Sequence, residues 1–283
     1  MGRRCSILYH TRQRFRIHQW KPPESLPSTF NHAVKATRAL GCQCLWTGSL
    51  CIIQGPGGDF NRQAKRMEQV YSGAYCVLAS SRSPGHYAGF LHPRNPRPTV
   101  VLRQERQAAP FYIAETIDDF KSHVLEGSPN KRGWVLQEHA LARRTVYFTD
   151  HQTDFECGDG VRCETMTKLT NELATFLGDP NFPQVIMKAQ QAETYLRYQD
   201  LYRTYSHLAL SRDSDRTLAI DGLQKRVLEA LDARGGYGIF DEGNKGRGSS
   251  RGMLPAVIHE VCCVGETEKQ DVFTRRNTPC FGD

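Results

Sequence analysis

A carboxylate and an imidazole stand side by side at Glu138-His139, in a segment with helical spacing. Such a pair can transfer protons in a reaction when burial or a neighbouring charge shifts its pKa. A helical carboxylate close to Arg143 and Arg144 is, however, more often a surface ion pair than a general base. No spacing forces the other acids and histidines together. The residues by themselves therefore indicate no particular reaction.

The sequence lacks the residue spacing that metal or phosphate binding requires. His259-Glu260 begins like a zinc-protease motif, but no second histidine follows one helical turn later. The ten cysteines form no pair of CxxC hooks, so we expect no metal site. The glycines of 55–58 lack the Lys-Ser/Thr pair of a phosphate-binding loop, and those of 235–252 follow a helix instead of a strand. We expect no cofactor.

Composition excludes several classes of protein. The chain has 37 basic and 30 acidic residues, and the net charge of +7 forms no basic stripe interleaved with aromatics, so we expect no nucleic-acid partner. No apolar run is long enough to cross a membrane, and no apolar secretory segment opens the chain. We therefore expect a cytoplasmic protein with reduced thiols. The start Met1-Gly2-Arg3-Arg4-Cys5-Ser6 leaves N-terminal lipidation open.

Apolar periodicity predicts the elements that must position these residues. Helix 28–40, strand 50–53, helix 59–73 and strand 74–79 together have the pattern of a βαβ unit with a parallel sheet. Further along the chain, the same periodicity predicts strands over 99–102, 111–114 and 145–148, and helices over 132–142, 164–177, 184–208 and 213–233.

Three segments carry a pattern that is more specific than any single residue. Residues 45–54 read LWTGSLCIIQ, residues 67–74 read MEQVYSGA, and residues 132–138 read RGWVLQE. In this order they resemble the three blocks of the fungal heterokaryon incompatibility (HET) domain, with a weaker resemblance over 202–222. The residues that match the family's motifs are Trp46, Ser49, Leu50, Cys51, Gln54, Met67, Tyr71, Arg132, Gly133, Trp134, Gln137, Glu138 and Arg143.

This resemblance implies a fold and a role. The fold would be α/β, with a mostly parallel sheet flanked by helices, distantly TIR- or flavodoxin-like, and with a helical C-terminal extension. The chain would divide into an irregular segment 1–27, a HET domain 28–160, a helical extension 161–234 and a Gly-rich, flexible tail 235–283. The role would be fungal self/non-self recognition and programmed cell death, through association with other proteins that include further copies of this chain or incompatibility partners.

Two alternatives accompany this interpretation. The distant likeness to TIR domains, some of which cleave NAD, implies an NAD hydrolase in which Glu138 or Glu68 is the working carboxylate; otherwise we expect no enzyme. Gly48 stands where the family has an aspartate, the family's first motif is reduced to residues 17–21, and a Trp-containing end is missing after Pro255. These departures are typical of a degenerate, non-functional relative.

Overall fold

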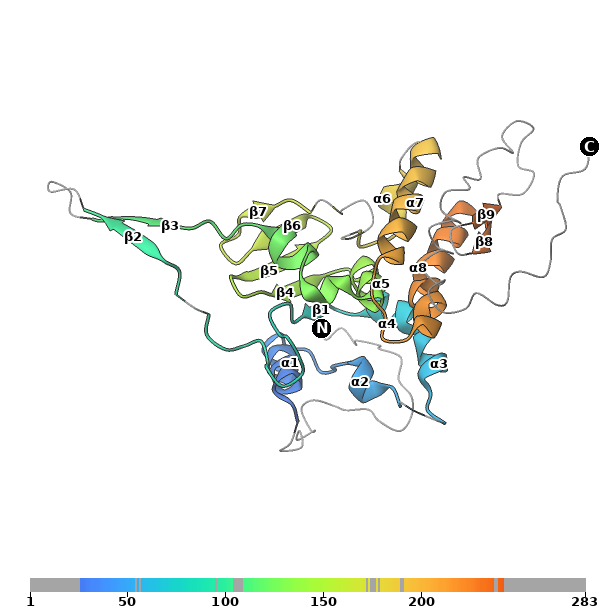
Figure 1. Cartoon of the computed structure of the whole chain (residues 1–283), viewed down its shortest axis with the longest axis horizontal. Helices are drawn as coiled ribbons and strands as arrows, with labels where there is room; N and C mark the ends of the chain where they lie inside the picture. The colour runs from blue at the N-terminus through green and yellow to red at the C-terminus, as the bar shows by residue number, and fades with distance from the viewer. Residues whose placement is uncertain are drawn as a thin grey trace, which may run out of the picture.

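A computed structural model describes residues 26–241, except 54, 56, 95, 104–108, 172, 174–176, 178, 189–190 and 237–238. Most of the irregular N-terminal segment, the lipidation motif, Gln54, His259-Glu260 and the tail beyond residue 241 therefore lie outside the described residues. Figure 1 shows a small sheet with helices gathered along one side and a two-stranded hairpin projecting from the other.

The main sheet has five strands in the order β1-β4-β5-β6-β7. Only β1 and β4 run parallel, with Val77 opposite Thr145, and every later pair is antiparallel. A second sheet pairs β2 with β3 and a third pairs β8 with β9. The strands are β1 (Val77–Ala79), β2 (Thr99–Leu102), β3 (Phe111–Ala114), β4 (Thr145–Phe148), β5 (Thr153–Cys157), β6 (Gly160–Cys163), β7 (Lys168–Leu169), β8 (Arg234–Gly236) and β9 (Ile239–Asp241).

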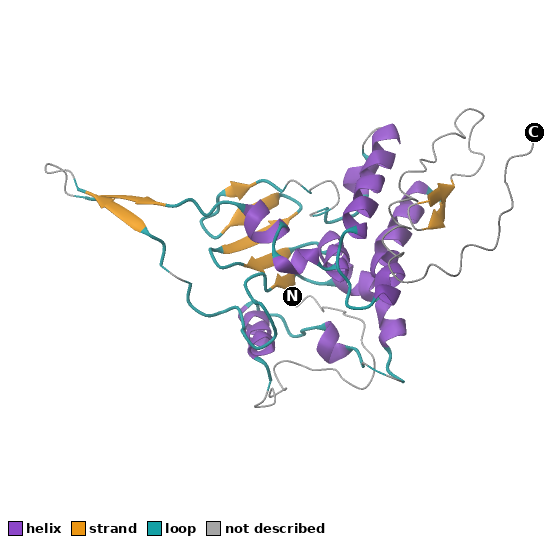
Figure 2. Cartoon of the chain, in the orientation of Figure 1, coloured by secondary structure: helices purple, strands orange, loops and turns teal. Residues whose placement is uncertain are grey.

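In Figure 2 most of the helices (purple) stand beside this sheet, on the side opposite the projecting hairpin. The α-helices are α1 (Ser28–Ala39), α2 (Gly48–Cys51), α3 (Phe60–Ala64), α4 (Met67–Gly73), α5 (Gly133–Leu141), α6 (Gln184–Met187), α7 (Gln191–Ser206) and α8 (Arg216–Leu231). The remaining helical turns are η1 (Lys121–Leu125), η2 (Ser128–Lys131) and η3 (Asp213–Asp215).

The α/β class is confirmed, but the prediction of a mostly parallel sheet is wrong. The loops after β4 and β5 are only a few residues long, and such loops can join only antiparallel strands. In the first loop the hydroxyl of Thr149 donates to the carbonyl of Gln152, and the amide of Gln152 donates back to that hydroxyl. At the end of the second, Gly160, the first residue of β6, adopts φ +99°. These turns fold the chain into a meander.

Two of the predicted elements are wrong in type. Leu50–Ile53, predicted as a strand, contributes instead to the short helix α2 and to the extended residues after it. A short apolar run fits either structure, and here the side chain of Asp59 binds the amide of Ile53 and closes a tight loop behind α2. The helix predicted over 164–177 is also wrong, because residues 168–169 form β7, which pairs with β6.

The larger core lies between the helices. It is built from α4, α5, α7 and α8, with side chains such as Leu136, Tyr198, Leu201 and Leu223 almost fully buried. A smaller core cluster joins Phe120 and Val124, from the η1 region, to Tyr147 of β4 and Val161 of β6. The helix predicted over 132–142 is therefore α5, and it packs on its sheet side as well as against the C-terminal helices.

Candidate functional site

A cavity of about 600 Å³ opens between α1, α4 and the chain that leads to α2. We call it the α1–α4 cavity. Its walls are mainly apolar and aromatic, whereas Glu138 and Arg132 bring charge to one part of the lining. A cavity of this size, with a few convergent polar groups in an apolar wall, is typical of a small-molecule site.

Glu138 lies at the wall that α5 contributes. Its carboxyl group is hydrogen-bonded to the hydroxyl of Tyr71, which α4 supplies. Burial raises the pKa of Glu138, although the Tyr71 hydrogen bond and the positive charge of Arg132 oppose that rise. Burial, together with the charge of Glu138, holds the pKa of Tyr71 well above its usual range. Tyr71 is therefore the donor in this pair, and Glu138 takes up a proton more readily than an ordinary glutamate.

Trp46 fixes the other side of Tyr71. The two rings meet edge to face, with centroids 5.7 Å apart and an interplanar angle of 79°. This geometry is favourable for aromatic pairs and holds the tyrosine ring against α5. Gly48 and Ser49, at the start of α2, line the cavity next to Trp46. An added Cβ at Gly48 would lie 3.7 Å from Trp46, which is an ordinary contact, so the position accepts the first carbon of a side chain.

A loop that the sequence did not single out closes the remaining side. His32 of α1 accepts hydrogen bonds at Nδ1 from the amides of Phe90 and Leu91, at 2.8 and 3.0 Å. Burial lowers the pKa of His32, which is consistent with an unprotonated Nδ1. Phe90 thereby reaches the cavity wall. No local pattern announces this contact, because nearly sixty residues separate the two segments.

Several motif residues hold in place the helices that form the cavity. Met67 is buried in the main core, Gln137 accepts a hydrogen bond from the amide of Gly222 in α8, and Trp134 packs edge to face on Phe60. Gly133 is buried, and its amide donates to the carbonyl of Ala209 at 2.8 Å. A Cβ at Gly133 would come within 2.9 Å of the Leu210 side chain, so glycine allows this close approach.

The other motif residues lie elsewhere. Leu50 and Cys51 are half-buried in α2, and Arg143 is exposed after α5. Glu68, the second carboxylate of the NAD-hydrolase hypothesis, lies outside the cavity lining and pairs with Arg226 of α8 at 2.6 Å. The structure thus brings Trp46, Ser49, Tyr71, Arg132 and Glu138 together and leaves Glu68 out.

A buried polar group lies behind Glu138. His139, the next residue, points the other way, and its Nε2 lies 2.6 Å from Oε2 of Glu156. The hydroxyl of Tyr147 donates to the same carboxylate oxygen at 2.7 Å, and Asn171 donates to the other oxygen. Burial raises the pKa of Glu156, but these three partners outweigh it and the net pKa is lowered. Glu138 and His139 therefore belong to two different environments and do not act as a pair.

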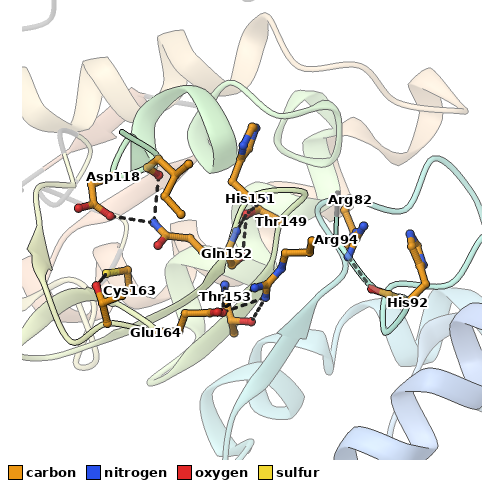
Figure 3. A network of polar contacts seen from close by, with 12 residues as sticks. Arg82, His92, Arg94, Asp118, Thr149, His151, Gln152, Thr153, Cys163 and Glu164 are labelled. Carbon is orange, nitrogen blue, oxygen red and sulfur yellow. Dashed lines mark hydrogen bonds and ion pairs between the residues drawn. The ribbon is translucent and has the colours of Figure 1, made fainter. Parts of the chain in front are cut away.

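Figure 3 shows a second polar network, over β5 and β6. Arg94 binds both carboxylate oxygens of Glu164, at 2.8 and 2.9 Å, and Gln152 donates to Asp118. Beneath them Asp154 is fully buried, and neither of its oxygens has a hydrogen-bond partner. Burial, followed by the charges of Asp118 and Glu164, raises the pKa of Asp154 to about 6. None of these residues lines the α1–α4 cavity.

Metal binding and membrane crossing have no support in the part of the chain that the structure describes. Over residues 26–241 with their gaps, no three His, Cys, Asp or Glu side chains are grouped closely enough to hold a metal ion. Among the described helices, none combines the length and the apolar character needed to span a bilayer.

Comparison with known proteins gives one match. Residues 5–138 match the family model of the heterokaryon incompatibility protein (HET). The matched range contains all three motif blocks, and it ends at Glu138, the carboxylate of the α1–α4 cavity. No curated protein matches the chain, and no solved structure matches it.

Proposed function

Because this chain carries a heterokaryon incompatibility (HET) domain, we propose that it acts in the cytoplasm in fungal self/non-self recognition and signals programmed cell death through association with other proteins. The α1–α4 cavity is the functional centre of that domain. Within it, Glu138 is the residue on which signalling depends most.

One observation carries this proposal: the three motif blocks, far apart in the chain, meet at a single cavity. Trp46 and Ser49 come from the first block, Tyr71 from the second, and Arg132 and Glu138 from the third. Packing alone would not require a carboxyl group with a raised pKa at the point where the blocks meet. Burying a carboxyl group costs free energy, and such groups are concentrated at functional sites.

Induced expression in fungal cells tests this proposal. We expect the native chain to reduce viability and Glu138→Gln, which keeps the size and the Tyr71 contact, to abolish that effect. Glu126→Gln, at an exposed glutamate outside the cavity lining, is the matched control and should kill as the native chain does. Death caused equally by the native chain and by Glu138→Gln, at equal protein levels, would remove the cavity from the mechanism.

The variant Gly48→Asp distinguishes an intact effector from a degenerate one. It restores the carboxylate of the family motif at a position where an added Cβ makes only ordinary contacts. Death with the native chain would mean that this carboxylate is dispensable. Death only with Gly48→Asp would identify a disabled effector, and survival with both, at confirmed expression, would contradict the cell-death role for this chain.

A second candidate function is NAD hydrolysis, favoured by Glu138 in its aromatic cavity. In that reaction the bond between nicotinamide and the ribose C1′ breaks, and the nicotinamide leaves with the bonding electron pair. Water adds to C1′ and releases one proton. Ionised Glu138 would stabilise the positive charge that develops on the ribose, and Trp46 or Tyr71 would stack on a ring of the substrate.

Incubation of the purified chain with NAD separates the two candidates. Nicotinamide release by the native chain, lost in Glu138→Gln and retained in Glu68→Gln, would establish the hydrolase and its carboxylate. Cell death without any nicotinamide release, from native chain of the same preparation, would leave protein association as the mechanism.

A further inference from the structure

The hairpin of β2 and β3 is the most exposed apolar element in the part of the molecule that the structure describes. It projects at the left of Figure 1, away from the helices, and none of its residues lines the α1–α4 cavity. All eight strand residues are exposed. We call it the β2–β3 arm. Its large apolar side chains, each 46–67% exposed, are Val100, Val101, Leu102, Phe111, Tyr112 and Ile113.

The arm is apolar on both faces. Residues directly opposite each other in an antiparallel pair share a face. Val100 with Ile113 and Leu102 with Phe111 therefore form one face, and Val101 with Tyr112 lies on the other. A sheet that has one face in water alternates apolar and polar residues, and this arm does not. Its sequence is that of strands covered on both sides.

Nothing in the described chain covers it. A two-stranded ribbon is at best marginally stable alone, and stability needs further strands or packing against a face. Six large apolar residues offer on the order of several hundred Å² of apolar surface, which approaches the ~800 Å² per partner of a standard interface. The arm can therefore supply most of one side of a stable interface.

The charges around the arm identify the strand that is open for pairing. β2 lies between Arg97 and Arg103, and charged side chains of this kind protect an edge strand from pairing. β3 has no arginine or lysine at either end; Pro110 precedes it and Glu115 follows it. Antiparallel pairing of two β3 strands about a two-fold axis brings no like charges opposite each other. It joins two arms into one four-stranded sheet with β2 at each outer edge.

We propose that the β2–β3 arm binds the same arm of a second copy of this chain and makes the protein a two-fold symmetric dimer. A chain with net charge +7 repels its own copies, and the uncharged arm is where two copies approach with least repulsion. A lipid surface is a poorer partner, because Arg97 and Arg103 flank β2 and insertion of the arm would take their charges out of water.

The dimer would give the protein association proposed above a surface and a partner. Only the biological meaning of the dimer rests on that proposed function. Sedimentation velocity of the full chain, over roughly 1–100 μM, tests it. We expect a reversible monomer–dimer equilibrium. Ile113→Lys places two added charges at the β3 interface and should weaken dimerisation at least about hundredfold. Because Ile113 is exposed, the fold should not change, and the melting temperature should equal the native one at concentrations where both chains are monomeric.

Tyr87→Lys is the matched control, since Tyr87 is exposed and apolar but lies outside the arm, and it should dimerise as the native chain does. Glu138→Gln should also dimerise, so loss of cell death and loss of the dimer are read independently. A native chain that stays monomeric throughout, or an unchanged equilibrium in Ile113→Lys, would overturn the proposal. Monomers that sediment with phosphatidylserine vesicles would assign the arm to a membrane instead.

Discussion

Nε of Arg226 lies 2.6 Å from Oε1 of Glu68, across 158 residues of sequence. The pair joins α4 to α8, and both side chains are about three-quarters buried. Arg226 also reaches the carbonyl of Phe182. Glu68 therefore has a structural partner, and the contact ties the second motif block to the C-terminal helices.

We predict that Arg226→Ala lowers the free energy of unfolding by about 1–3 kcal/mol, because it leaves the partly buried carboxylate of Glu68 unpaired. Urea denaturation measures this change. Lys225→Ala removes the neighbouring surface ion pair with Asp221 and should cost less than about 0.5 kcal/mol. Equal losses in the two variants would mean that the α4–α8 ion pair stabilises the protein no more than the exposed pair does.

Gly222 lets α8 approach α4 closely. A Cβ at this position would lie 2.7 Å from the Cβ of Glu68 and 2.9 Å from Oε1 of Gln137. Gly222→Ala should therefore destabilise the protein by about 1–3 kcal/mol, although alanine is the better helix former. Gly73→Ala in α4, where nothing lies within 4 Å, is the comparison and should be neutral or stabilising. Thermal melts of the two variants that shift alike would contradict the close-packing argument.

Asp154 should make stability depend on pH. Its pKa is about 6 in the folded protein and 3.8 as its ordinary value, so the folded state binds the proton more tightly. Ionisation of Asp154 therefore lowers the free energy of unfolding most above pH 6, and this loss decreases as the pH falls towards 3.8. Asp154→Asn should therefore stabilise the protein by about 1–3 kcal/mol at pH 8 and by little at pH 4.

Asp213→Asn, at a carboxylate that is 94% exposed, should show no such pH dependence. Chemical denaturation of both variants at pH 4, 6 and 8 supplies the comparison. A gain for Asp154→Asn that is the same at every pH would mean that ionisation of Asp154 is not its cause.

Tyr147 supplies a buried hydrogen bond to Glu156. Tyr147→Phe should lower the free energy of unfolding by about 1–3 kcal/mol at pH 7, because the ionised carboxylate loses a donor where water cannot replace it. The pKa of Glu156 is lowered in the folded state, so the stability from its ionised form is present above pH 4.5 and is lost as the pH falls through the folded pKa. The deficit of Tyr147→Phe should therefore shrink in acid.

Tyr87→Phe removes a hydroxyl from a side chain that is 73% exposed and lies outside the β2–β3 arm, and it serves as the control, with an expected change near zero. Denaturation curves at pH 7 and pH 4 measure both variants. A Tyr147→Phe deficit that grows in acid would contradict the assignment of the bond to ionised Glu156.

Local patterns were sufficient to predict α1 and α5 from the spacing of apolar residues, and β2, β3 and β4 from short runs of β-branched and aromatic residues. They failed for α2, where four residues are too few for a period. They also failed for β7, a two-residue strand that exists only because β6 offers it an edge. The Cys-Gly-Asp-Gly run at 157–160 was a hairpin signal that the sequence contained and the prediction did not use.

For the site, the motif blocks contained Trp46, Tyr71 and Glu138 of the cavity without showing that these residues meet. The contrast between Glu138 and Glu68 depends on Tyr71 and Arg226, which approach them from other helices, and no local spacing encodes that. The same holds for Asp154, whose pKa is raised by burial and by the charges of Asp118 and Glu164. Long-range packing decides these properties, and a single sequence does not display it.

The contacts of α5 also have a consequence for synthesis of the chain. The family match stops at Glu138, inside α5, yet Gln137 completes its hydrogen bond only with Gly222, and Gly133 only with Ala209. While the ribosome is still making the segment before α8, the face of α5 that packs on α8 has no cover. The domain therefore cannot finish folding as it emerges, and a messenger truncated near residue 200 would yield a product for the cell's quality control to degrade.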